Sequence, residues 1–193
     1  MSLVDLIAQA DERGLAASGL ACLDRCVPLL GGDDEVLRPL WSSLADGGAW
    51  GEYLDRARTE LEVIDPGQDG AGDGAGEDEA AVLVRRMLAA APDDPFAPDL
   101  REWADACSVA ALRIHRLLDA AAGDTDTCPV SAHREGRTDG ISPLVAAELR
   151  RQVTVLELLA GRGAGGLRPA LEVSTEGRRV LRAVVSRRAR GRA

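Results

Sequence analysis

Residues 103–118, WADACSVAALRIHRLL, place an acid, a thiol and an imidazole within one run of small apolar residues. Asp105, Cys107 and His115 are the residue types from which a cysteine nucleophile and its base are built. On a helix that turns about 100° per residue, however, Cys107 lies on the inward apolar line, Asp105 points roughly the opposite way and His115 lies on the flank. The spacing therefore predicts a small buried thiol rather than a catalytic cluster. It also predicts that Asp105 faces solvent or pairs with Arg101, and it leaves His115 as a candidate pocket residue.

Cys22 and Cys26 are four residues apart and share a helix face, a spacing that two metal ligands can use. A zinc site needs two further ligands. The remaining Cys and His residues follow no metal-binding order: Cys107, Cys128, His115 and His133. We therefore predict no metal site and no cofactor.

Two acid pairs have the i, i+3 spacing with which helical nucleotide pyrophosphatases hold magnesium: Glu52 with Asp55, and Glu102 with Asp105. The dense run of acids in that family is missing here. Glu102 and Asp105 also point away from the apolar stripe of their helix, so solvation or capping is the favoured interpretation. The sequence contains no P-loop, dinucleotide-binding glycine pattern, nucleophile elbow or kinase signature. These observations favour a protein without catalytic activity.

The charge is divided unevenly along the chain. The net charge is −9, yet the last sixteen residues contain seven Arg and no acid, so residues 1–177 carry −16. Such an acidic surface repels phosphate backbones and anionic lipids, and it suits either simple solvation or a basic partner. For the Arg-rich segment 178–193 we favour an intramolecular or subunit-bridging charge match, or a solvated tail, over binding to nucleic acid. Its candidate contacts to a partner or an anion are Arg178, Arg179, Arg182, Arg187 and Arg188.

Composition and periodicity both predict an all-α fold. Aromatic residues make up only 3% of the chain, and Ala and Leu dominate over the β-branched residues that fill sheets. Apolar residues recur at helical spacing, and Ser142 followed by Pro143 is a strong helix start. The predicted helices cover residues 3–13, 16–30, 36–44, 50–64, 79–91, 100–121 and 143–160. Residues 167–190 form one helix bent near Gly177, two short helices or a hairpin, and we favour the helical arrangements.

Two segments lack this periodicity. Residues 65–79 are mostly Gly and acids, and residues 123–141 hold turn residues throughout, so we predict a long flexible loop at each. A chain of 193 residues has the length of one domain with a substantial core. We therefore predict one helical domain, residues 1–193, built as a bundle of about seven or eight helices.

The start of the chain, MSLVDLIAQADERG, carries acids where a signal peptide has basic residues, and no apolar run is long enough to span a membrane. We therefore expect a cytoplasmic protein without membrane contact. Its four cysteines are then expected to be reduced thiols.

Several segments together resemble the YjaG-like family of bacterial all-helical proteins of unknown function. They are ACLDRCVPLL, PLWSSL, YLDRARTELEVIDP, ADACSVAALRIHRLL and SPLVAAELRRQVTVLELL, and their order and spacing agree over most of residues 1–160. The resemblance implies an all-α fold and supplies no reaction. It singles out Asp105, Glu148 and Gln152 as polar positions of the family pattern.

Glu148 lies one turn before Gln152, and the two flank the apolar stripe of their helix. Such a pair fastens two helices or lines a groove, and we favour the fastening role. The leading hypothesis is a cytoplasmic interaction or scaffold protein that binds a basic protein partner or itself. One alternative is a small-molecule or metal-dependent enzyme with a helix-lined pocket near His115 and Glu148. A further alternative is nucleic-acid binding through the Arg-rich C-terminus.

Overall fold

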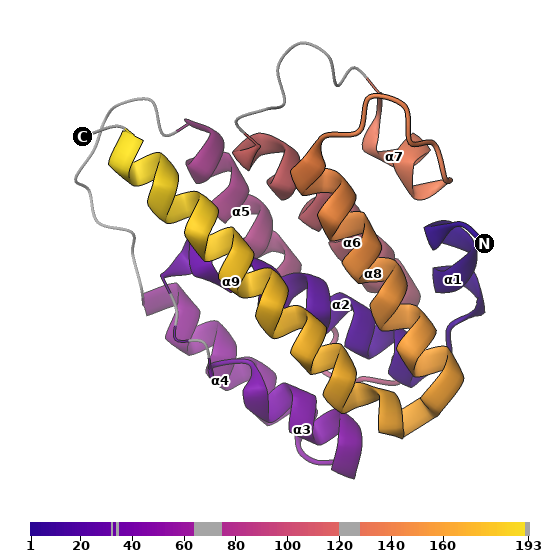
Figure 1. Ribbon diagram of the computed structural model, residues 1–193. Helices are drawn as coiled ribbons and strands as arrows, with labels where there is room; N and C mark the ends of the chain where they lie inside the picture. Colours follow the sequence, from indigo (N-terminus) through magenta and orange to yellow (C-terminus); the bar gives the residue numbers. More distant parts are fainter. Residues whose placement is uncertain (32, 34, 64–74, 120–127, 192–193) are drawn as a thin grey trace.

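The structure is a computed structural model that describes residues 1–31, 33, 35–63, 75–119 and 128–191 (Figure 1). These residues form nine α-helices and two short 3-10 helices, and no strand occurs among them. The helices are α1 (Leu3–Gln9), α2 (Glu12–Cys26), α3 (Arg38–Asp46), α4 (Trp50–Val63), α5 (Ala75–Ala89), α6 (Leu100–Leu118), α7 (Val130–Arg134), α8 (Pro143–Arg162) and α9 (Leu167–Gly191). The 3-10 helices are η1 (Val27–Leu30) and η2 (Gly163–Gly166). The predicted all-α class is confirmed.

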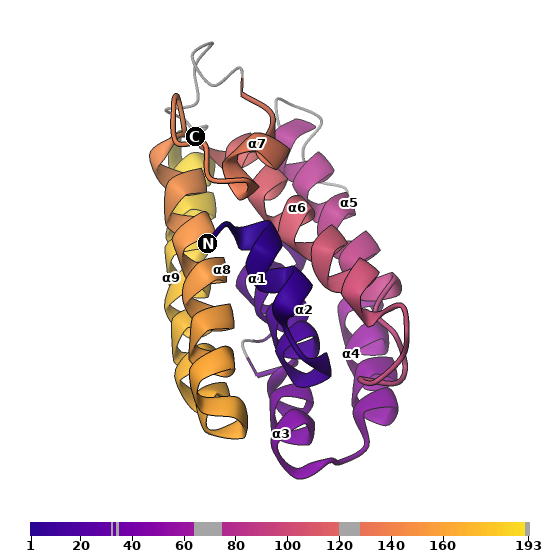
Figure 2. The same cartoon turned by 90° about the vertical axis from the view of Figure 1, so that its right-hand side faces the viewer.

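Helix α2 lies at the centre of the bundle. Figure 2 shows α8 and α9 on one side of it and α5 and α6 on the other, and α2 contacts all four. Every residue from Gly14 to Cys26 is buried, so α2 has no solvent face after its first two residues. Gly19 allows this close packing, because a Cβ at that position would lie 2.5 Å from a ring carbon of Trp103 on α6.

Several helix starts and stops follow the local signals in the sequence, but the predicted boundary between helices 3–13 and 16–30 is wrong. α1 ends at Gln9, and α2 begins at Glu12 because Asp11 caps it by accepting a hydrogen bond from the Gly14 backbone N–H. Ser2 and Asp5 form the predicted capping box at the start of α1. α2 ends at Cys26, and the chain continues as η1 with Pro28 inside it, as expected for a proline that lacks a backbone donor. Pro143 occupies the first turn of α8 after the N-cap residue Ser142.

The end of the described chain is the single 25-residue helix α9, so the hairpin and the two short helices considered for residues 167–190 are both wrong. α9 runs antiparallel to α8, to which η2 joins it (Figure 1). It passes through Gly177 without a break. A Cβ at Gly177 would lie 2.3 Å from Cδ of Arg25, so this glycine makes room for the aliphatic stem of a buried arginine. Residues 178–191 of the Arg-rich segment belong to α9, and residues 192–193 lie outside the described residues.

Both predicted loops are shorter than expected. Residues 75–79 belong to α5, because Glu77 and Asp78 in its first turn interact favourably with the positive end of the helix. Residues 130–134 of the predicted loop 123–141 form α7, whose Val130 packs with Leu112 and Val145 in a small apolar cluster. Tertiary packing thus orders a segment that has no sequence period. Residues 65–74 and 123–127 of the predicted loops lie outside the described residues.

None of the helices described has both the length and the apolar character needed to cross a membrane.

Candidate functional site

The centre of the bundle contains an ion pair between Arg25 on α2 and Glu148 on α8. The Arg25 Nε donates to Glu148 Oε2 at 2.8 Å, and its Nη2 donates to Oε1 at 2.6 Å. Both side chains have 0% solvent exposure. A bidentate pair of this kind fixes the direction as well as the distance between two helices.

A polar network extends from this pair toward α6. Gln152 Nε2 donates to Glu148 Oε1 at 2.9 Å and to the Ser108 carbonyl at 3.3 Å. The Ser108 hydroxyl donates in turn to Gln152 Oε1 at 2.6 Å. Arg25 also reaches α9, where its Nη1 donates to the Ser174 hydroxyl at 3.4 Å. The network therefore ties α2, α6, α8 and α9 together.

Arg134 on α7 closes the outer edge of the network. Its Nε donates to the Ser108 hydroxyl at 3.1 Å, and its Nη2 pairs with Asp105. The expected partner of Asp105, Arg101, instead donates to the backbone carbonyls of Ile7 and of Ala10, the residue after α1. Asp105 is half-exposed and is paired in a way that the sequence did not reveal, because α7 was predicted to be loop.

His115 is fully buried beside Glu148 rather than on a helix flank that lines an open pocket. Its Nδ1 lies 2.7 Å from the Ala111 carbonyl, which can only accept, so this nitrogen carries the proton. Its Nε2 lies 3.6 Å from Glu148 Oε2 and has no hydrogen-bond partner among the described residues. Burial lowers the pKa of His115 and outweighs the opposing effect of the Glu148 carboxylate, so the imidazole is neutral.

Burial by itself raises the pKa of Glu148, but the charge of Arg25 and the hydrogen bonds from Arg25 and Gln152 hold that pKa below its ordinary value. Glu148 is therefore a carboxylate, and the pKa of Arg25 is raised despite burial because of its partner. The site is a fully ionised pair with a neutral imidazole beside it. It has the charges of a general-base site but lacks an opening for a substrate.

The cavity that touches this network is very small. Its volume is about 10 Å³, and it lies beneath Leu3 and Ile7 of α1. Its polar lining comes from Arg25, Ser108 and Gln152 together with Ser18 and Cys22. That volume has room for about one water molecule. A substrate could reach His115 or Glu148 only if helices moved apart, so in this arrangement the cluster fastens helices together.

The sequence singled out Asp105, His115, Glu148 and Gln152, and the structure brings all four into or beside one network. It did not single out Arg25, whose position carried a usable signal. Every neighbour of Arg25 in ACLDRCVPLL is apolar except Asp24, and a helix that is apolar on all faces is buried. A charged residue on such a helix must find a partner inside the protein.

Asp24, the other charged residue in that stretch, pairs with Arg178 at 2.9 Å, and both side chains are almost fully buried. Arg188 donates to Glu77 Oε1 at 3.2 Å, which joins the end of α9 to the start of α5. Arg179 is exposed and lies 3.7 Å from Glu176. Arg182 and Arg187 are exposed. Part of the Arg-rich segment is thus matched by acids within the chain.

Cys22 and Cys26 are both buried and free, as is Cys107. Within the described ranges, no three His, Cys, Asp or Glu residues are grouped so that they could hold a metal ion. Burial raises the pKa of Cys22 to about 12 and that of Cys26 well above its ordinary value. These thiols are therefore protonated, chemically quiet core residues.

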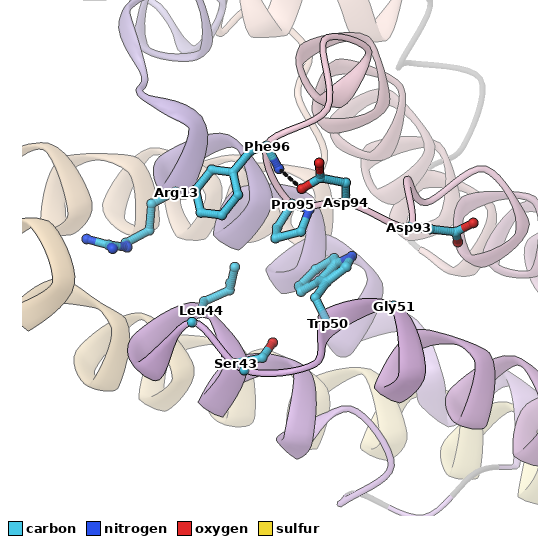
Figure 3. Close-up of a pocket in the computed structure, with 11 residues that line it drawn as sticks. Arg13, Ser43, Leu44, Trp50, Gly51, Asp93, Asp94, Pro95 and Phe96 are labelled. Atoms are coloured by element: carbon cyan, nitrogen blue, oxygen red, sulfur yellow. Dashed lines mark hydrogen bonds between the residues drawn. The ribbon is translucent and has the colours of Figure 1, made fainter.

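An open groove lies at the surface where the turn between α3 and α4 faces the segment that joins α5 to α6 (Figure 3). Its volume is about 300 Å³. Figure 3 shows Leu44, Trp50, Pro95 and Phe96 around the hollow. Phe96 is 56% exposed, whereas Trp50 is buried and forms the floor. We call this surface the Phe96 groove.

The floor of the Phe96 groove is rigid. The Trp50 Nε1 donates to the Pro92 carbonyl at 2.8 Å. Its ring meets the ring of Trp103 edge to face, with centroids 6.5 Å apart. The groove therefore exists before any ligand arrives. Asp93 and Asp94 lie on its rim, and Arg13 lines its other side with its side chain turned away from the hollow (Figure 3).

Comparison of the chain with models of protein families, with curated proteins and with solved structures finds no match in any of the three. Any statement about function therefore rests on the residues and geometry described above.

Proposed function

We propose that this protein is an interaction module that binds a basic segment of a protein partner in the Phe96 groove. The observation that carries the proposal is the exposure of Phe96, 56%, above a preformed apolar hollow of about 300 Å³. The four large apolar side chains that are exposed in the described chain are Met1, Val4, Val82 and Phe96, and Phe96 alone among them is aromatic and lines this groove. Aromatic side chains beside pockets are typical binding hot spots.

The apolar part of the groove favours an apolar anchor on the partner. Leu44, Pro95 and Phe96 surround a space that an aliphatic or aromatic side chain fills, while Trp50 supplies a fixed floor. Filling a preformed hollow avoids the entropy loss of ordering a flexible loop. This makes a short segment with one or two anchors a sufficient ligand.

Charge favours a basic partner. Asp93 and Asp94 are exposed on the rim, and residues 1–177 as a whole carry −16. Asp93 pairs with Arg58 at 2.8 Å, but the Asp93 side chain is 75% exposed, so its carboxylate remains accessible to a cation of the partner. Complementary charge of this kind accelerates association and rejects acidic competitors.

The enzyme alternative would require the closed site at His115 and Glu148 to open, and both side chains have 0% exposure. The nucleic-acid alternative depends on free positive charge in the C-terminal segment. Arg178 and Arg188 are already matched there by Asp24 and Glu77, which reduces that charge. The groove proposal needs no such opening, because the Phe96 groove is already open at the surface.

The test is site-specific photocrosslinking in the cells that naturally make the protein. Phe96 is replaced by a photoreactive phenylalanine analogue, and the matched control carries the same analogue at Val82, which is 41% exposed on α5. We expect a specific adduct from position 96, with the crosslinked peptide of the partner rich in Lys or Arg. Equal adducts from both positions, an acidic crosslinked peptide or no adduct from position 96 would contradict the proposal.

A further inference from the structure

A second cleft, independent of the Phe96 groove, lies where the amino end of α8 meets the carboxyl end of α9. Its volume is about 390 Å³, within the range of about 300 to 1,000 Å³ that is usual for small-molecule sites. Leu144 and Ala147 line it from α8, Val184 lines it from α9, and Leu118 closes its inner end. We call it the α8/α9 cleft.

Its walls are apolar but incompletely covered. Leu144, Ala147 and Val184 are only half-buried, whereas Leu118 is 1% exposed. Half-buried apolar side chains on two facing helices leave surface that a further apolar group would remove from water, which favours binding. The cleft therefore favours a hydrocarbon chain over a polar ligand.

The charged groups at the cleft are not equivalent. Arg188 is engaged with Glu77 at 3.2 Å and with the Leu118 carbonyl at 3.4 Å. Asp119 accepts a hydrogen bond from the Leu144 backbone N–H at 3.0 Å, so the positive end of α8 compensates part of its charge. Arg187 is exposed, and no hydrogen bond or ion pair joins it to another residue in the described parts of the chain. The positive charge that remains for pairing with a ligand in the cleft is thus the guanidinium of Arg187.

We propose that the α8/α9 cleft binds an amphiphilic anion: a hydrocarbon chain lies along Leu144, Ala147 and Val184, and a carboxylate or phosphate head pairs with Arg187. A guanidinium suits both head groups because it offers two parallel donors. The head group could come from a free medium-chain carboxylate or from a lipid in a membrane. We assign the free carboxylate, since the acidic body of the protein repels anionic membrane surfaces.

The probe is decanoate, added below its micelle-forming concentration to the full chain. Binding is followed by NMR through the methyl groups of Leu144 and Val184, with the exposed Val82 methyls as the remote reference. We expect saturable shifts at the two cleft residues only, with a Kd on the order of 1 mM or tighter. Neutral decanol should bind more weakly, because it has no charge for the guanidinium.

Variants separate the charge from the shape of the cleft. Arg187→Gln should weaken decanoate binding about threefold to fivefold, as expected for one exposed ion pair, and Arg187→Lys should recover most of that loss. Arg182→Gln, an exposed position on the same helix that does not line the cleft, should leave binding unchanged. All three are surface substitutions on a long helix, so the fold is retained.

Three results would overturn the proposal: no saturable binding up to about 5 mM decanoate, equal effects of Arg187→Gln and Arg182→Gln, or binding only to vesicles of anionic phospholipid. The last result would assign the cleft to a lipid surface. None of these measurements involves a residue of the Phe96 groove. The failure of one proposal can therefore be told apart from the failure of the other.

Discussion

Arg25 and Glu148 are 123 residues apart in the chain, yet their side chains form two hydrogen bonds at a point that solvent does not reach. Removing the charge of one partner leaves the other buried without compensation, which costs far more than the net contribution of the pair. This relationship makes the polar centre of the bundle a source of specificity: α2 and α8 can pack in only one register if both charges are to be satisfied.

Glu148→Gln should therefore lower the free energy of unfolding by about 3 to 5 kcal/mol. Arg25→Met should have a cost of similar size, because it orphans the carboxylate instead. The double variant Arg25→Met/Glu148→Gln should lose much less than the sum of the two single losses. Urea unfolding of all four proteins measures this cycle.

The exposed pair Glu35 and Arg38 provides the control for that cycle. Its atoms are 2.5 Å apart, but both side chains are more than half exposed. Glu35→Gln should change the unfolding free energy by less than about 1 kcal/mol. Additive losses in the Arg25/Glu148 cycle would show that the two buried charges do not depend on each other.

Gly177→Ala tests how α9 fits against the same arginine. The new Cβ would lie 2.3 Å from Arg25 Cδ and 3.0 Å from Arg151 Cδ, so both stems must shift. We expect a loss of about 1 to 3 kcal/mol, although alanine is normally the better helix former. Chemical denaturation measures the loss.

The matched control is Gly161→Ala near the end of α8, where a Cβ would meet nothing within 4 Å. There alanine should be neutral or stabilising by up to about 1 kcal/mol, because it restricts the unfolded chain. A gain at both positions would mean that Gly177 is not required by the packing of Arg25.

The sequence was sufficient to predict the helices that carry a periodic apolar stripe and clear caps. Ser2 with Asp5 and Ser142 with Pro143 mark starts that the structure retains. It was insufficient for α7, because five residues are too short to show a period and are ordered by packing against α6. Local signals predict elements, whereas short elements depend on contacts with distant parts of the chain.

The polar network was predictable only in part for the same reason. Glu148 and Gln152 share one helix, so their proximity follows from spacing alone. Arg25, Ser108 and Arg134 lie on three other helices, and their convergence depends on how those helices are arranged. His115 was placed on a flank by its helix angle, but helix α8 covers that flank and buries it beside Glu148.

Acid should destabilise the protein through His115. Because burial lowers its pKa from 6.5, the unfolded chain binds a proton more readily than the folded protein does below about pH 6.5. The stability is therefore complete above that pH and falls as the pH decreases. The pKa of Glu148, also lowered from its ordinary 4.5, adds a further loss at more acidic pH, as the carboxylate becomes protonated.

The charged groups that face His115 are Glu148, Arg25 and Arg151, so the buried imidazolium would meet one anion and two cations. His115→Phe removes the titrating group and keeps a ring of similar shape. Its unfolding free energy should vary less than that of the parent between pH 6.5 and pH 5 (roughly the window set by the ordinary pKa of histidine). Identical slopes in urea unfolding across this window would exclude His115 as the source.

The four thiols should differ sharply in reactivity. Cys128 is half-buried, whereas Cys22, Cys26 and Cys107 are buried, and burial raises the pKa of each of these three. At pH 8 we expect Cys128 to react rapidly with a thiol reagent such as DTNB. The other three should react only as the structure opens.

Cys22 lies under α1, so its labelling shows whether α1 detaches before the rest of the core unfolds. Cys22 lines the small cavity beneath Leu3 and Ile7, and Ile7 is 4% exposed. Ile7→Ala should weaken the hold of α1 by about 2 to 4 kcal/mol and expose Cys22 before Cys26 or Cys107. Timed alkylation followed by peptide mass spectrometry distinguishes the three. If all three thiols are labelled at one rate in the variant, α1 does not open separately, because a single global unfolding event would then expose the whole core.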